Sequence, residues 1–79
     1  MNLSILIPLL NEEESLQELY SWIIKVMQSN NYSYEIIFVD DGSTDNSWEI
    51  IEGFSNENPN VKGIRFMKNF GKSKTVKKI

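Results

Sequence analysis

Two short runs of apolar residues, Leu3–Ile7 and Tyr34–Val39, are typical of buried parallel strands rather than of half-exposed ones. Val61–Met67 is predicted to form a third strand. The two stretches between these three segments repeat their apolar residues at helical spacing instead. The pattern therefore predicts the order β-α-β-α-β, which indicates an α/β fold with a parallel sheet and right-handed crossovers.

Both predicted helices have recognisable first residues. Asn11 has the side chain of an N-cap, and Glu14 can complete a capping box with it. Ser43 or Thr44 can cap the second helix in the same way. A third helix is expected from Ser73 onward. The residues predicted to face the core are Leu16, Leu19, Tyr20, Ile23 and Met27 in the first helix and Trp48, Ile51 and Phe54 in the second.

The composition is that of an ordinary globular protein, with 79 residues of which 41% are hydrophobic and 24% charged. Three parallel strands with two helices are barely a domain, so residues 1–79 are expected to form a single partial domain. The absence of cysteine and histidine excludes disulfides, thiolate metal sites and the commonest general base. The apolar runs are too short to span a membrane and no basic signal region follows Met1, so a cytoplasmic location is expected.

Charge is distributed unevenly along the chain. All eleven acidic residues lie at or before Glu57, whereas seven of the eight basic residues lie at or after Lys62. The basic segment is either a solvated tail or an anion site, for phosphates or for an anionic membrane surface. The charge pattern alone leaves both interpretations open.

Polar residues gather where the three strands are predicted to end, and ligands of open parallel sheets bind outside the carboxyl ends of the strands. One carboxylate of the Asp40-Asp41 pair is sufficient to accept a hydrogen bond from a nucleobase or a ribose. Alternatively, one of these aspartates only caps the turn. A metal site is disfavoured, because adjacent side chains on an extended strand point to opposite faces. The three strand ends are Pro8-Leu9-Leu10-Asn11-Glu12, Asp40-Asp41-Gly42-Ser43 and Lys68-Asn69-Phe70-Gly71-Lys72.

Three motifs in this order resemble the start of family-two glycosyltransferases with the GT-A fold. They are strand-P-x-x-N-E at 5–12, Y-E-I-I-F-V-D-D-G-S-T-D at 34–45 and N-F-G-K at 69–72. The sequence is most similar to the dolichyl- and polyprenyl-phosphate sugar transferases. This resemblance implies a βαβαβ Rossmann-like three-layer unit, the N-terminal nucleotide-binding portion of such an enzyme. The whole enzyme would move a sugar from a UDP- or GDP-sugar to a polyprenyl phosphate or saccharide, in lipid-linked sugar or cell-envelope biosynthesis.

The resemblance also implies roles for single residues. The backbone around Pro8 would cradle the base with help from Glu12 or Glu13, Asp41 would accept a hydrogen bond from the base, and Lys72 would offset phosphate charge. Leu10 stands where the family usually has an aromatic residue, so ring stacking on the base is lost. The predicted nucleotide-binding residues are Pro8, Leu10, Asn11, Glu12, Asp40, Asp41, Gly42, Ser43, Asn69, Gly71 and Lys72.

Catalysis in the family uses a later D-x-D motif that holds a divalent cation on the diphosphate, and no D-x-D occurs in this sequence. We therefore predict no catalytic residue and no metal ligand in this chain, and no sugar transfer by these residues alone. Mg²⁺ or Mn²⁺ is expected only in a full-length enzyme. The same holds for association with the inner face of a membrane, which would depend on parts outside this chain.

The expected partner is a nucleotide-diphospho-sugar, with a second copy of the chain as an option and no nucleic acid. An alternative hypothesis is a non-enzymatic small α/β module that associates through an open sheet edge. A receiver-like or flavodoxin-like domain also places acidic residues at strand ends, but the order of the motifs and the short length disfavour it.

Overall fold

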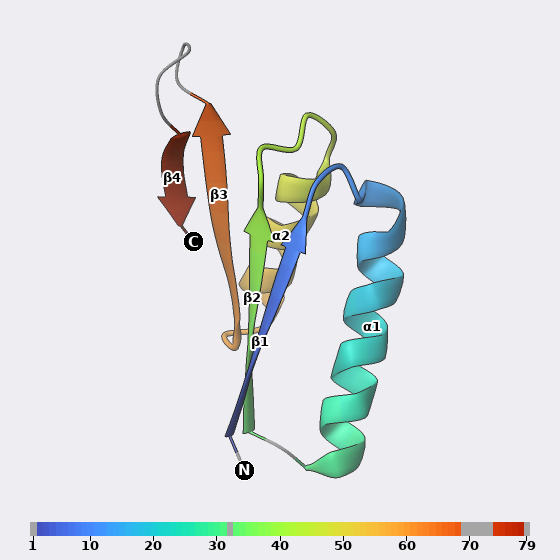
Figure 1. Ribbon diagram of the computed structural model, residues 1–79. Helices are drawn as coiled ribbons and strands as arrows, with labels where there is room; N and C mark the ends of the chain where they lie inside the picture. Colours follow the sequence, from blue (N-terminus) through green and yellow to red (C-terminus); the bar gives the residue numbers. More distant parts are fainter. Residues whose placement is uncertain (1, 32, 69–73, 79) are drawn as a thin grey trace.

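The computed structural model describes residues 2–31, 33–68 and 74–78 (Figure 1). The strands form one sheet in the order β1-β2-β3-β4. β1 pairs with β2 and β2 with β3 in parallel, while β4 is antiparallel to β3. The predicted β-α-β-α-β order and the parallel sheet are confirmed. The elements are β1 (Asn2–Leu9), α1 (Glu13–Asn30), β2 (Ser33–Asp40), α2 (Ser47–Glu57), β3 (Val61–Lys68) and β4 (Lys74–Lys78).

The register of the parallel strands brings their carboxyl ends to one edge of the sheet. Leu9, the last residue of β1, lies beside Asp40, the last residue of β2. On the other side, Asp40 lies beside Arg65 near the end of β3. The loops that leave β1 and β2 therefore start next to each other, as the prediction of a common ligand edge requires.

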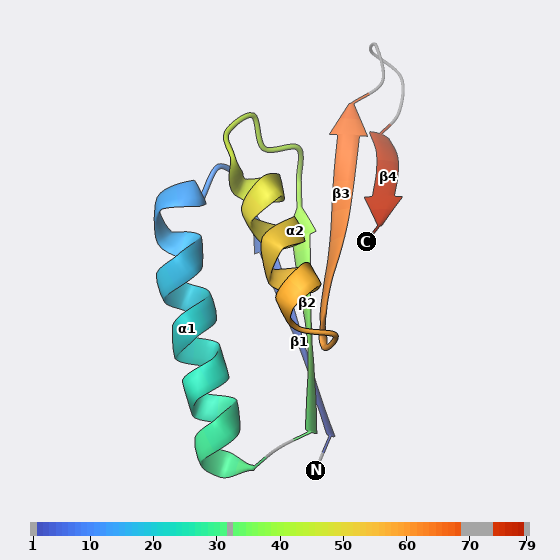
Figure 2. The same ribbon diagram turned by 180° about the vertical axis from the view of Figure 1, so that it is seen from behind.

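Both helices lie on the same face of the sheet, as Figure 2 shows from behind. The two right-handed crossovers step across the sheet in the same direction, so they place α1 and α2 side by side. The Rossmann-like α/β unit is confirmed, but within residues 2–31, 33–68 and 74–78 it has two layers, and the expected third layer is not found. The other face carries Leu6, whose side chain is 65% exposed.

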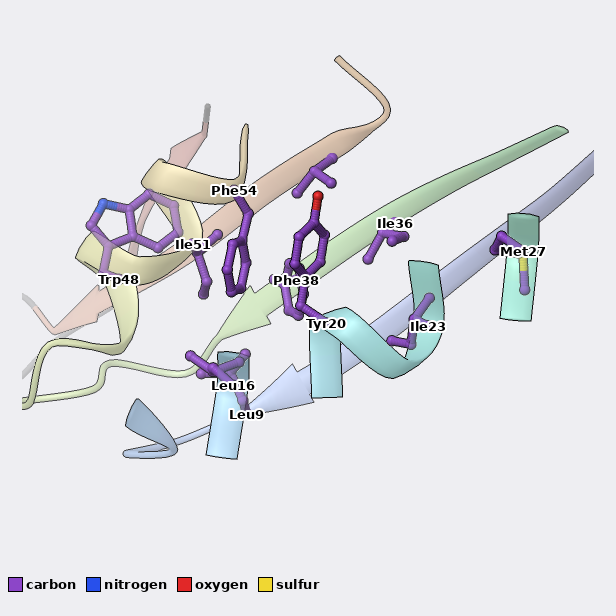
Figure 3. Close-up of a cluster of buried hydrophobic side chains, with 11 residues drawn as sticks. Leu9, Leu16, Tyr20, Ile23, Met27, Ile36, Phe38, Trp48, Ile51 and Phe54 are labelled. Carbon is purple, nitrogen blue, oxygen red and sulfur yellow. The ribbon is translucent and has the colours of Figure 1, made fainter. Parts of the chain in front are cut away.

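The core is the layer between the two helices and the sheet (Figure 3). The rings of Tyr20 from α1 and Phe54 from α2 stack with their centroids 4.0 Å apart. Phe38 from β2 lies beneath them, 5.8 Å from Phe54. The predicted inner stripes are confirmed except at Leu19, which is 37% exposed. The buried hydrophobic residues are Leu9, Leu16, Tyr20, Ile23, Met27, Ile36, Phe38, Trp48, Ile51, Phe54 and Val61.

The expectation of a third helix from Ser73 onward is wrong. The described residues beyond position 73 form β4, which pairs with the end of β3. Thr75 and Val76 are β-branched residues, and the segment adds backbone hydrogen bonds to the side of β3 that faces away from β2. Pairing with β3 therefore outweighs a helical tendency that the sequence expressed only weakly.

The predicted helix starts are also wrong by one to three residues. The N-cap of α1 is Glu12 rather than Asn11, and that of α2 is Asn46 rather than Ser43 or Thr44. Neither N-cap residue caps its helix with its own side chain, so the capping box is not formed. Asn31 ends α1 in the left-handed conformation, which asparagine adopts more readily than most residues. Among the described helices, neither is both long and apolar enough to cross a membrane.

Candidate functional site

The loops after β1 and β2 are joined by the side chain and backbone of Asn11. We call residues 10–12 the first loop and residues 41–46 the second loop. The backbone N–H of Asn11 donates to Ser43 Oγ (2.8 Å). Asn11 Oδ1 accepts from the backbone N–H of Thr44 (2.8 Å) and of Asp45 (3.3 Å). Asn11 itself has a φ of 52°, a conformation that asparagine tolerates better than most residues. The two loops therefore form one continuous surface.

The starts of the two helices cap each other. The backbone N–H of Glu12 donates to Ser47 Oγ (2.9 Å), and that of Glu13 donates to Asp45 Oδ2 (3.2 Å). Asp45 Oδ1 accepts from the N–H of Ser47 (2.9 Å), so one carboxylate serves both helices. This exchange satisfies N–H groups that local caps leave open. Sequence reasoning missed Asp45 and Ser47, although the cluster of Ser, Thr, Asp and Asn before α2 is a capping signal.

Asp40 caps the turn from inside the protein. Its side chain is fully buried, and its Oδ1 accepts from the backbone N–H groups of Gly42 (3.1 Å) and Ser43 (2.7 Å). Asp40 therefore has the turn-capping role that the sequence left open for one of the two aspartates. A direct contact between Asp40 and a nucleotide stays a prediction.

Gly42 is required by the conformation of this turn. Its φ is +94°, and a Cβ added to it would lie 3.2 Å from the backbone oxygen of Phe66 on β3. Residues other than glycine rarely adopt this backbone conformation. Gly42 thus allows the second loop to pass close to β3 immediately after Asp41.

The predicted binding residues that remain at the surface lie at the junction of the two loops. The side chains of Pro8, Glu12 and Asp41 are exposed, and Leu10 is 51% exposed. The backbone N–H of Asp41 donates to the carbonyl of Leu9 (3.0 Å), which holds the start of the second loop against the end of β1. The apolar side chain of Leu10 and the carboxylates of Glu12 and Asp41 are therefore exposed on these two neighbouring loops. The predicted residues Asn69, Gly71 and Lys72 lie outside the described residues.

A polar hollow of about 300 Å³ opens beside the first loop, at the start of α1. A diphosphate would be repelled by its acidic lining, so the hollow is suited to donors such as base or sugar N–H and O–H groups. No group of three acidic residues within the described ranges is arranged to hold a metal ion. The hollow therefore does not fit the divalent cation of the family. Its lining residues are Asn11, Glu12, Glu13, Glu14, Ser15 and Asp45.

The basic segment has structural uses in its described part. Lys62 Nζ lies 2.6 Å from Glu35 Oε2 in an exposed ion pair between β3 and β2. Arg65 donates from Nη2 to the backbone carbonyl of Ser43 (3.1 Å) in the second loop. Lys62 and Arg65 therefore both make contacts within the fold, and Arg65 contacts the second loop of the candidate site.

The pKa of the Asp45 carboxylate is shifted by its surroundings. Burial raises the pKa of Asp45, but the hydrogen bonds from Ser47 and Glu13 outweigh burial and leave the pKa below its ordinary value of 3.8. A carboxyl whose pKa is lowered by folding stabilises the folded state above its unfolded pKa, and this contribution is lost as the pH falls through the folded value.

Replacing Asp45 with asparagine is therefore expected to lower stability at neutral pH and to change little in strong acid. Urea unfolding of the wild type and of Asp45→Asn, followed by circular dichroism from pH 7 to pH 2, measures the gap between their midpoints. The difference between the two urea midpoints should be largest above pH 3.8 and should disappear as the pH falls below it. A gap that stays constant over this range would contradict the capping role of the charged carboxylate.

Comparison with known proteins identifies the family. Residues 4–79 match the family described as Glycosyl transferase family 2. The chain is 45% identical over 76 residues to a dolichol-phosphate mannosyltransferase of Pyrococcus furiosus, a match that covers 96% of this chain and 21% of that protein. It is 44% identical over 68 residues to an uncharacterized glycosyltransferase, YkcC, of Bacillus subtilis, which covers 86% of this chain and 21% of the relative.

A third relative is named for a related acceptor. It is the undecaprenyl-phosphate 4-deoxy-4-formamido-L-arabinose transferase of Proteus mirabilis, 40% identical over 74 residues, with 92% of this chain and 23% of that protein covered. The chain thus spans less than a quarter of the length of these relatives. With a match over nearly all its residues, and with the parallel sheet and joined strand-end loops described above, the chain belongs to glycosyl transferase family 2.

Proposed function

We propose that this chain forms the nucleotide-binding portion of a glycosyltransferase whose donor is a UDP- or GDP-sugar. The observation that carries the proposal is the position of Asp41. Asp41 is exposed at the start of the second loop, and its backbone N–H donates to the carbonyl of Leu9, which stands between the exposed residues Pro8 and Leu10. A base lying on these two apolar residues would present its ring N–H to the Asp41 carboxylate.

The diphosphate of the donor would extend away from the acidic hollow rather than into it. The hollow is lined by the carboxylates of the α1 start, whereas seven of the eight basic residues lie at or after Lys62. We place the diphosphate on the side of β3, where Lys72 of the N-F-G-K motif is expected to offset its charge. The base and ribose would then occupy the side of the first loop.

For the whole protein we propose transfer of the sugar to a polyprenyl phosphate. The support is the activity for which two relatives are named, one a dolichol-phosphate mannosyltransferase and one an undecaprenyl-phosphate sugar transferase. A divalent cation would be bound by residues beyond those of this chain, since the sequence contains no D-x-D. Accordingly, the 79-residue chain assayed with donor, acceptor and Mg²⁺ or Mn²⁺ should give no turnover.

The nucleotide site is tested by calorimetric titration of the chain with UDP and with GDP, each repeated on Asp41→Ala. The wild type should bind one nucleotide more tightly than the other, and Asp41→Ala should weaken that binding about tenfold or more, as loss of a hydrogen bond to a charged group does. Glu57→Ala is the matched control, because it removes an exposed carboxylate from the opposite end of α2.

The possible results separate the parts of the proposal. Equal affinity of the wild type and Asp41→Ala would remove Asp41 from its assigned role. No binding of either nucleotide by the folded wild type would contradict the site as a whole. The alternative of a non-enzymatic small α/β module that associates through an open sheet edge is not favoured by the family match.

A further inference from the structure

Arg65 on β3 lies directly behind the second loop and contacts it through the main chain. Its Nη2 donates to the carbonyl of Ser43 (3.1 Å), and its guanidinium lies over the indole of Trp48, 5.7 Å from the ring centroid. Trp48 is buried in the first turn of α2. One planar cation therefore connects β3, the second loop and the start of α2.

Arg65 is also the cross-strand neighbour of Asp40. The two residues are paired in the parallel register, so their side chains point to the same face of the sheet. Asp40 Oδ2 and Arg65 Nε are both buried and have no hydrogen-bond partner among the described residues. A buried carboxylate is costly unless a positive charge lies near it, and the parallel register places Arg65 on the same face of the adjacent strand.

The turn after β2 is consequently held from two sides. Asp40 binds the N–H groups of Gly42 and Ser43, and Arg65 binds the carbonyl of Ser43. The backbone oxygen of Phe66, the residue after Arg65, closes the space beside Gly42. These contacts determine where the backbone of Asp41 leaves the sheet.

We propose that Arg65 is a positioning residue of the nucleotide site, acting through the Ser43 carbonyl to hold the Asp41 carboxylate in place. This inference rests on the proposed function. It assigns to Arg65 a role that the sequence motifs did not indicate. Lysine is a poor substitute, because an ammonium group cannot both stack flat on Trp48 and reach the carbonyl with a planar fork of donors.

The test uses Arg65→Met, Arg65→Lys and the control Lys62→Met, which removes a cation from the exposed side of the same strand. Affinities for UDP and GDP are measured on each folded variant and on the double variant Asp41→Ala with Arg65→Met. Two-dimensional NMR of the nucleotide-free proteins records the amide shifts of residues 41–45. Thermal unfolding confirms that each variant is folded at the working temperature.

Arg65→Met should weaken nucleotide binding about tenfold, comparable to the loss of an outer-shell partner at a metal site, and Arg65→Lys should recover part of it. In the Asp41→Ala background the same change should have almost no further effect, because both act on one contact. Lys62→Met should bind as the wild type does. Additive losses from Asp41→Ala and Arg65→Met would overturn the positioning role.

The NMR measurement keeps this inference separate from the proposed function. Amide shifts of residues 41–45 should change in Arg65→Met and not in Lys62→Met, whether or not a nucleotide binds. Unchanged shifts in Arg65→Met would overturn the inference even if UDP or GDP binds the wild type. Failure of the wild type to bind either nucleotide would overturn the proposed function, and with it any role of Arg65 in nucleotide binding.

Discussion

Replacing Phe38 with alanine is expected to leave most molecules of this protein unfolded at 25 °C. Phe38 is fully buried at the centre of the sheet, beneath the stacked rings of Tyr20 and Phe54. Removing a buried phenylalanine ring costs about 3–5 kcal/mol. A single core in a chain of this size rarely supplies more than about 3–5 kcal/mol of net stability, so the substitution removes most or all of it.

Urea unfolding followed by far-UV circular dichroism measures this loss. The control is Trp22→Ala, which removes a still larger aromatic side chain from α1 at a position that is 63% exposed. Its effect should stay within about 0.5 kcal/mol. If the two variants lost similar amounts of stability, the core would not lie between the helices and the sheet as described.

Gly42→Ala is expected to lower both stability and nucleotide affinity. The new Cβ meets the Phe66 backbone oxygen at 3.2 Å, and the φ of +94° is strained for alanine. A left-handed conformation alone costs an L-residue about 1–2 kcal/mol. Because β3 is part of the sheet, relief must come from movement of the second loop, which carries Asp41.

Gly53→Ala is the matched control, and its expected change in stability has the opposite sign. Gly53 lies in the interior of α2, and a Cβ at this position has no neighbour within 4 Å. Alanine should therefore stabilise the helix by about 0.5–1 kcal/mol and leave nucleotide binding unchanged. Thermal unfolding and calorimetry of the two variants measure these effects. Equal effects at both glycines would contradict the account of the turn.

The sequence was sufficient to predict what depends on local periodicity. Apolar runs identified β1 and β2, and the helical spacing of Leu16, Tyr20 and Ile23 identified the buried face of α1. The D-D-G-S motif indicated the turn after β2. These features are encoded by neighbouring residues, so they can be read without knowing the tertiary structure.

What the sequence could not predict depends on partners far away in the chain. Asn11 has every property of an N-cap, yet its side chain binds the second loop, more than 30 residues away. The helix starts are capped by each other, which no local pattern reveals. The two-layer arrangement follows from the strand order, and the apolar runs alone do not specify that order. Arg65 was predicted only as part of a basic segment, because its partner is a backbone carbonyl.

The central claim is that the ends of β1 and β2 form one nucleotide site. Amide chemical-shift mapping of the chain during titration with UDP and with GDP tests it most directly. We predict that the shifts concentrate in residues 8–12 and 40–45 and in the N-F-G-K segment at 69–72. Shifts centred on the face of the sheet that carries Leu6, or no shifts with either nucleotide, would contradict the claim.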